Sequence, residues 1–197
     1  GKSCGSTTRW QETAGQVGVS MRREIRPSRD NRDAKTGRAP NGKPYESVWD
    51  FPRPPMIESV EWRIRVRHAD VAIVDAPRCL RVLETSQPPA YYVEPEFVDR
   101  TLFMGSDRTT SCEWKGVADY VDVYAGSSVV RQGAWTYQNP TDRFASLSGC
   151  WAFYAQRFDE CRVDDEQVTS NEGQFYGGWV TANVTGPFKG APGTLHW

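Results

Sequence analysis

Short stretches in which apolar and polar residues alternate, separated by turn signals, constrain the fold of this 197-residue chain most strongly. The segment EWRIRVRHADVAIVDA, which begins at Glu61, alternates on both sides of a break at Ala69 and Asp70. This pattern is typical of a β-hairpin in which each strand buries one face. We therefore expect antiparallel strands in this part of the chain.

The same alternation continues toward the C-terminus. It predicts strands over residues 78–85 and 100–107, and two further hairpins. VADYVDVYAGSSVVRQGAWTY should turn at Ala125–Ser127, and CWAFYAQRFDECRVDDEQV should turn at Asp164 and Asp165. Only EFVDR and PTDRFASLSG indicate helical turns. The chain is thus predicted to be mainly β, built from antiparallel hairpins as a small barrel or as two packed sheets, with little helix.

Composition divides the chain near residue 44. Residues 21–43 are charged, rich in Gly, Pro and Asn, and nearly free of large apolar side chains, so burial cannot offset their ordering entropy. We expect residues 1–44 to form a basic, flexible tail and residues 45–197 to form one β domain. Within it, residues 45–56 should be an extended arm, packed on the domain by Tyr45, Val48, Trp49 and Phe51. The alternative is that this arm is a proline-rich ligand for another protein.

Charge is distributed unevenly, with a net +5 over residues 1–55 and −6 over the remainder. A basic arm can bind nucleic acid or an anionic surface, or it can lie against its own acidic body. Asp30 and Asp33 interrupt this arm, and no aromatic residue lies among the charges of residues 21–43, which argues against a nucleic-acid partner. No apolar run is long enough to predict a membrane-spanning helix, and the first fifteen residues lack the apolar stretch of a secretory signal. We therefore expect a cytoplasmic protein.

Five cysteines, at positions 4, 79, 112, 150 and 161, are an odd number with wide spacing and no C-x-x-C pair. This spacing favours neither a disulfide framework nor a zinc ribbon. We expect free thiols, no structural metal and no cofactor.

Familiar catalytic motifs do not occur in the chain. His68 and His196 lie in neither a GxSxG elbow nor an HExxH pair, so the local sequence does not indicate a Ser-His-Asp triad or a histidine-rich metal site. The glycine-rich end GPFKGAPGT lacks the strand-then-helix context of a phosphate-binding loop. A loop that follows the sheet is the better interpretation of that segment.

Polar residues embedded in aromatic sequence indicate a pocket. Glu84 ends an aliphatic run before a Pro-Pro turn that Tyr92 follows, Lys115 lies in CEWKG where a loop enters a strand, and Trp135 and Tyr137 lie in AWTYQNP. If these residues lie on neighbouring strands, the aromatic side chains would form walls for a flat ligand. Lys115 would bind an anion, and Glu84 would act as a hydrogen-bond acceptor or a base. The alternative is a buried Glu84–Lys115 pair that only fixes a loop.

Cys112 lies three residues before Lys115, and a nearby ammonium lowers the pKa of a thiol toward a reactive range. A nucleophile also needs a base, and no histidine is close in the sequence. The alternative is that Cys112 is a small buried apolar residue. Glu84, Cys112 and Lys115 are therefore the catalytic candidates, with no reaction assigned.

Several motifs, taken in chain order over about Tyr45 to Trp197, resemble a bacterial and fungal family known as domain of unknown function 427, sometimes labelled nucleotidyltransferase-like. They are ESVWDFPRPP, RCLRVLETSQPPAYYVEP, SCEWKG, AWTYQNP, AFY, FYGGW and GPFKGAPGT. The resemblance implies a compact, mainly β, cytoplasmic domain of barrel or tent type, without an established metal, substrate or reaction. By position, the polar and aromatic residues of the family motifs fall on Glu84, Tyr92, Cys112, Lys115, Trp135, Tyr137 and Tyr154.

Two functions stay open at this point. In the first, the pocket binds a small molecule, anionic or nucleotide-like, with or without catalysis. In the second, the chain is a non-catalytic β module that binds a protein or peptide through its aromatic surface. The first is favoured because Lys and Glu are costly to bury without a use. It predicts that Glu84 and Lys115 lie near each other at one concave site.

Overall fold

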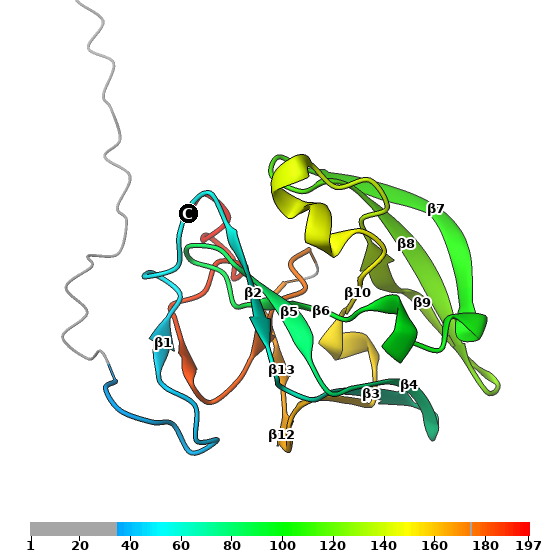
Figure 1. The fold of residues 1–197 in the computed structure, drawn as a ribbon, viewed down its shortest axis with the longest axis horizontal. Coiled ribbons are helices and arrows are strands. Elements are labelled where there is room, and N and C mark those ends of the chain that lie inside the picture. Colours follow the sequence, from blue (N-terminus) through cyan, green and yellow to red (C-terminus); the bar gives the residue numbers. More distant parts are fainter. Residues whose placement is uncertain (1–34, 174) are drawn as a thin grey trace, which may run out of the picture.

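The structure, a computed structural model, describes residues 35–173 and 175–197. Within these residues the chain forms five sheets of two to four strands, connected by short 3₁₀ turns. The predicted class, mainly β with antiparallel hairpins and little helix, is confirmed. The sheets of the described part do not close into one barrel; they pack as separate layers around a shared interior, which is compatible with a tent-like arrangement (Figure 1).

The largest sheet has the strand order β10-β9-β8-β7 and curves along one side of the molecule (Figure 1). Its strands are β7 (Phe103–Cys112), β8 (Gly116–Ala125), β9 (Ser128–Thr136) and β10 (Trp151–Phe153), all antiparallel. The predicted β8–β9 turn is confirmed, since the strands are joined by two residues, of which Gly126 has a φ of +59° that glycine adopts without strain.

A second four-stranded sheet has the order β12-β11-β3-β4. It contains β3 (Ile64–His68), β4 (Val71–Ala76), β11 (Glu160–Val163) and β12 (Glu166–Gln167). Its two hairpin turns lie at the predicted positions. The main hydrophobic core joins this sheet to the first, because buried side chains from both sheets meet in one cluster that includes Ile64, Val66, Ile73, Val121, Val123 and Phe153.

A third sheet, β2-β5-β6, consists of β2 (Met56–Val60), β5 (Cys79–Leu83) and β6 (Ala90–Tyr92). Arg81 in its central strand is only 1 % exposed. Its guanidinium pairs with the carboxylates of Glu46 and Glu58 and lies 4.3 Å from the ring centroid of Trp62. These contacts satisfy the buried charge and attach the N-terminal arm to the sheet.

The remaining elements are short. β1 (Glu46–Ser47) pairs in parallel with β15 (Val184–Thr185), and β13 (Thr169–Ser170) pairs with β14 (Trp179–Val180). The 3₁₀ turns are η1 (Pro95–Phe97), η2 (Arg100–Leu102), η3 (Asp142–Leu147) and η4 (Ala155–Arg157). η1 and η3 overlap the two segments in which helical turns were predicted. No helix of the described ranges has the length and apolar character that crossing a bilayer requires.

The arm was expected to start at Tyr45, but residues that precede Tyr45 also contact the domain. Residues 1–34 of the predicted tail lie outside the described part. In the rest of that tail, Asn41 donates to Glu166 and Asn183, and Lys43, 9 % exposed, forms an ion pair with Asp164. Contacts with the domain therefore begin in the segment that was assigned to the flexible tail.

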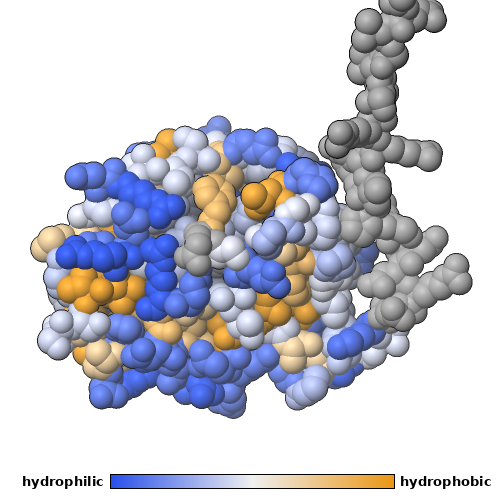
Figure 2. Space-filling model, turned by 180° about the vertical axis from the view of Figure 1, so that it is seen from behind, coloured by the Kyte–Doolittle hydropathy of each residue, from blue (hydrophilic) through white to orange (hydrophobic). Residues whose placement is uncertain are grey.

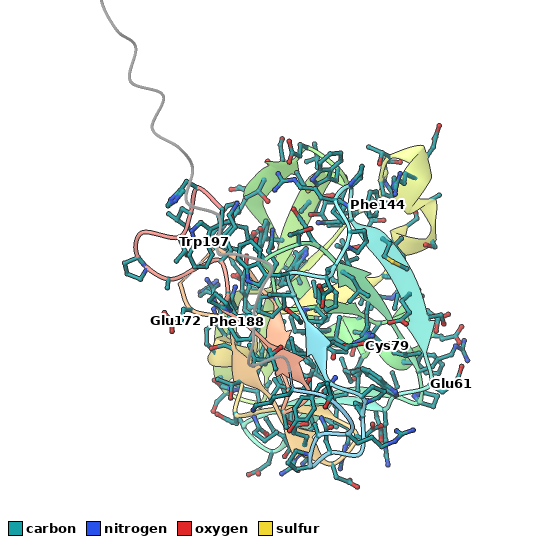
Figure 3. All side chains as sticks on the ribbon, turned by 90° about the vertical axis from the view of Figure 1, so that its left-hand side faces the viewer. Glu61, Cys79, Phe144, Glu172, Phe188 and Trp197 are labelled. Atoms are coloured by element: carbon teal, nitrogen blue, oxygen red, sulfur yellow. The ribbon has the colours of Figure 1, made fainter. Side chains whose placement is uncertain are left out.

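Within the arm, Val48 and Phe51 are buried, whereas Trp49 is only half-buried. The Trp49 indole donates to the Pro187 carbonyl at 2.9 Å, and its ring centroid lies 5.5 Å from that of Trp197. Figure 3 shows Phe188 and Trp197 on the same side of the molecule, far from Phe144 in η3. The C-terminal segment thus packs on the arm.

On the opposite face from Figure 1, apolar surface forms patches interrupted by hydrophilic residues (Figure 2).

Candidate functional site

One pocket of about 200 Å³ gathers side chains from distant parts of the chain. It lies where β6 and the loop before it meet the face of β7–β9, with residues 175–178 along another wall. All seven residues selected from the sequence line this pocket. They are Glu84, Tyr92, Cys112, Lys115, Trp135, Tyr137 and Tyr154. The structure therefore brings together every residue of the predicted set.

Strand alternation places the aromatic residues on one face. In the β8–β9 register Tyr120 is opposite Trp135, and Tyr137 follows two residues later on the same side. Tyr154 follows β10 directly, and Tyr92 ends β6. Side chains from three strands and one strand end thus converge on a single cavity.

These rings form a connected wall. The Trp135 indole donates to Tyr92 Oη at 3.3 Å, and its ring centroid lies 4.6 Å from that of Tyr154. Tyr154 is stacked with Tyr120 at 6.4 Å, and Tyr92 lies 6.3 Å from Tyr137. Offset and edge-on aromatic pairs at such separations are favourable and fix ring positions. The wall is therefore held in place without a ligand.

The β7–β8 turn, CEWKG, explains how Lys115 reaches this wall. Gly116 has a φ of +97°, which only glycine adopts without strain, and it lets the chain reverse directly into β8. Thr141 holds the turn, since its N–H donates to the Lys115 carbonyl at 3.2 Å and its hydroxyl to the Trp114 carbonyl at 2.6 Å. With its backbone fixed in this way, the Lys115 side chain extends into the pocket.

Lys115 is a buried ammonium, 9 % exposed, whose Nζ lies 5.9 Å from the Tyr137 ring centroid. Burial alone would lower the pKa of Lys115, but Tyr92, Cys112 and Glu84 outweigh burial, so that the pKa is raised. The side chain is therefore charged at neutral pH. The neighbouring groups thus offset the cost of burial, but among the described residues no carboxylate forms a direct ion pair with Lys115 Nζ.

Glu84 faces the same pocket from the loop after β5 and is half-buried. Burial raises the pKa of Glu84, and the positive charges of Lys115 and Arg53 oppose this effect without cancelling it. Among the described residues, Glu84 and Lys115 make no direct ion pair with each other. Glu84 and Lys115 thus lie at one concave site, as predicted. They do not form the direct ion pair of the alternative, in which the two residues only fix a loop.

Cys112 differs from the other described cysteines. Cys79, Cys150 and Cys161 are buried, and burial raises their thiol pKa, to about 12 for Cys79 and about 11 for Cys150. Cys112 is half-exposed and lines the pocket beside Lys115, and its thiol is one of the groups that raise the pKa of Lys115. All four are free thiols, and Cys4 lies outside the described residues.

The rim contains residues that the sequence did not single out. Arg53 pairs with Glu113 at 3.0 Å, and Lys189 Nζ donates to the Trp197 carbonyl at 2.7 Å. Phe175 is 57 % exposed at the edge of the pocket. The alternation of VADYVDV could have indicated Tyr120, but no local signal connects the rim residues to the strands that they approach.

The described part of the chain holds no group of three or more His, Cys, Asp or Glu side chains arranged to bind a metal ion. Lys115, Arg53 and Lys189 face Glu84 and Glu113, so cationic groups outnumber anionic groups around the pocket. Chemically, this arrangement can attract an anion and stack a ring. It can also hold a proton on Glu84, because the raised pKa keeps that carboxyl protonated at higher pH than an exposed one.

A family model described as a domain of unknown function, DUF427, matches residues 56–164, which is more than half of the chain. A comparison with curated proteins finds no match. The matched segment contains all seven predicted pocket residues. The rest of the pocket comes from outside it, from Arg53, residues 175–178 and Lys189.

Proposed function

The chain belongs to the DUF427 family, and from that premise we propose that its pocket binds a small ligand that carries an anionic group and a flat aromatic or apolar part. The observation that carries this proposal is the Lys115 ammonium, charged and nine-tenths buried, in the wall of an aromatic pocket. A buried charge is costly unless it is paired. Among the described residues Lys115 has no direct ion-pair partner, and an anionic ligand would supply one.

The size of the pocket limits the ligand. Its volume of about 200 Å³ is below the roughly 300–1,000 Å³ of drug-sized ligand pockets. A carboxylate or phosphate attached to a single ring fits this space, whereas part of a larger nucleotide-like molecule would extend past the rim at Phe175. The aromatic residues that line the pocket, Trp135 and Tyr92 among them, supply its apolar wall.

Catalysis is the finer form of the proposal. Glu84 supplies a carboxyl whose pKa is raised by burial, so it can donate as well as accept a proton nearer to neutral pH. Cys112 supplies a thiol beside the Lys115 ammonium. These two groups and Lys115 remain the catalytic candidates for a ligand that binds in the pocket.

Binding is tested by isothermal titration calorimetry with benzoate and phenyl phosphate, and with benzyl alcohol as a neutral probe of similar shape. We expect the two anions to bind at least tenfold more tightly than the alcohol. Lys115→Met should remove this preference. Lys43→Met is the matched control, because Lys43 is equally buried, at 9 % exposed, but pairs with Asp164 outside the pocket.

Equal affinity for the anions and the alcohol, or an unchanged anion preference in Lys115→Met, would contradict the proposal. The alternative of a peptide-binding module makes a different prediction. It is favoured by the exposed Phe175 at the rim, and it requires that Phe175→Ser weakens peptide capture while Lys115→Met does not.

A further inference from the structure

Three residues that are far apart in the sequence meet at the side where the β3–β4 and β8–β9 hairpins end (Figure 1). His68 ends β3, Ser128 begins β9, and Asp159 precedes β11. His68 Nε2 lies 2.8 Å from Ser128 Oγ, and His68 Nδ1 lies 3.3 Å from Asp159 Oδ2. The two imidazole nitrogens are thus divided between a hydroxyl and a carboxylate, as in a Ser-His-Asp triad. None of the three lines the pocket described above.

Neighbouring groups hold the histidine and the carboxylate in place. The Ala69 N–H donates to Asp159 Oδ2 at 2.8 Å. The His68 ring meets the Phe158 ring edge-on, at 6.0 Å and 88°. Phe158 can occupy this position because residue 133 is glycine, where a Cβ would lie 2.8 Å from the Phe158 ring. The orientation of the His68 imidazole is therefore set by the Phe158 ring on one side. On the other side it is set by the Asp159 carboxylate, which the Ala69 N–H holds in place.

The backbone beside the histidine forms a tight two-residue hairpin turn. Ala69 and Asp70 have φ values of 45° and 62°, and a type I′ turn requires positive φ at both central residues. This turn directs the Ala69 N–H toward Asp159, so the hairpin that ends β3 also helps to hold the carboxylate of the three-residue cluster.

The exposure of the three side chains also suits a site that a substrate has to reach. Ser128 is partly exposed, the His68 side chain is 17 % exposed and the Asp159 side chain is 65 % exposed. The His68 Nδ1–H and the Asp159 carboxylate are within ion-pair distance without the alignment of a hydrogen bond. Catalytic hydrogen bonds are often long or poorly aligned before substrate binds.

We propose that Ser128, His68 and Asp159 form a hydrolytic site for small, activated carboxylic esters. Ser128 Oγ attacks the ester carbonyl carbon while its proton passes to His68 Nε2. The tetrahedral intermediate then expels the alkoxide, which takes that proton and leaves as the alcohol, so that an acyl-serine remains. Water attacks the acyl-serine, gives a proton to Nε2 and releases the carboxylic acid as Ser128 regains its proton. Asp159 is the positioning residue, because it holds Nδ1 protonated and stabilises the imidazolium.

The test uses a fluorophosphonate probe and 4-nitrophenyl acetate with the full chain. Mass spectrometry of the labelled protein should place the phosphonyl group on Ser128. Ser128→Ala should remove labelling, and His68→Gln should slow labelling and ester hydrolysis by about 100-fold or more. Asp159→Asn should slow both while Asp159→Glu restores part of the rate, which a purely structural role would not produce.

Matched controls lie next to the site and at the end of the chain. Ser127→Ala, in the same turn, and His196→Gln, the other histidine, should react like the unmodified protein. Labelling of the unmodified protein at any residue other than Ser128, or no labelling at all, would overturn the proposal. So would a labelling rate that His68→Gln leaves unchanged while the melting temperature stays the same.

Discussion

Gly177 lies against the pocket wall, and Gly177→Ala provides a sharp test of how tightly that wall is packed. A Cβ at position 177 would lie 2.1 Å from Trp135 Cη2 and 2.8 Å from Cζ3. Carbon atoms pack at about 3.5–4.0 Å, so the indole has to move by more than about 1 Å. Trp135 is only 6 % exposed and is held by Tyr92 and Tyr154, so this movement disturbs the whole aromatic wall.

Overpacking of this kind costs about 1–3 kcal/mol of unfolding free energy. For a chain of this length, that corresponds to a melting temperature lower by about 2–12 °C. Calorimetric melting and urea unfolding measure the loss of stability, and titration with phenyl phosphate should show weaker binding in the same variant. Both effects have one cause, the displaced Trp135 ring.

Gly105→Ala is the matched control. Gly105 is exposed in β7, and a Cβ there would meet no atom within 4 Å. We expect the control to be as stable as the unmodified protein or slightly more stable, because alanine lowers the entropy of the unfolded chain. If Gly177→Ala melts and binds like Gly105→Ala, the reasoning about the pocket wall is refuted.

Three further predictions concern pH, thiols and the arm. Burial raises the pKa of Glu84, so the folded protein keeps a proton there at pH values at which the unfolded chain has released it. The unfolding free energy should therefore fall as pH rises above the ordinary carboxyl range. Urea titrations of Glu84→Gln should lack that fall. In a Cys4→Ser variant, a thiol reagent should modify Cys112 quickly in the native protein and the other three cysteines only after unfolding, and rapid modification of Cys79 or Cys161 would contradict their burial. A chain that begins at residue 45 should melt below one that begins at residue 35, because it lacks the Lys43–Asp164 ion pair and the Asn41 hydrogen bonds. Equal melting temperatures would support a domain boundary at Tyr45.

The sequence was sufficient to predict the main hairpins and their turns, because both signals are local, but β2 and the short strands β13–β15 were not predicted. The turns at Ala69–Asp70 and Asp164–Asp165 follow from breaks in alternation, and the structure has them in place. The pocket could be located for a related reason. Glu84, Lys115 and Trp135 each lie where an aliphatic or aromatic strand meets a loop, so neighbouring strands bring such residues to a common edge.

Other features depend on contacts between segments that are distant in the chain, and no local pattern encodes them. Arg81 was expected only as part of a strand, yet its buried guanidinium is satisfied by carboxylates from β1 and β2. Val48 and Trp49 were both expected to anchor the arm, but the sequence does not show that Val48 is fully buried whereas Trp49 is half-buried and packs against Trp197. The spacing of His68, Ser128 and Asp159 matches no motif, because two hairpins and a loop bring them together.

The central claim, that Lys115 and the aromatic wall form a ligand site, is tested most directly by a crystal structure of the protein with phenyl phosphate. The account predicts a phosphate oxygen about 2.7–3.2 Å from Lys115 Nζ, with the phenyl ring against Trp135 and Tyr92. A structure at saturating phenyl phosphate in which this pocket holds no ligand, or in which the phosphate points away from Lys115, would contradict it.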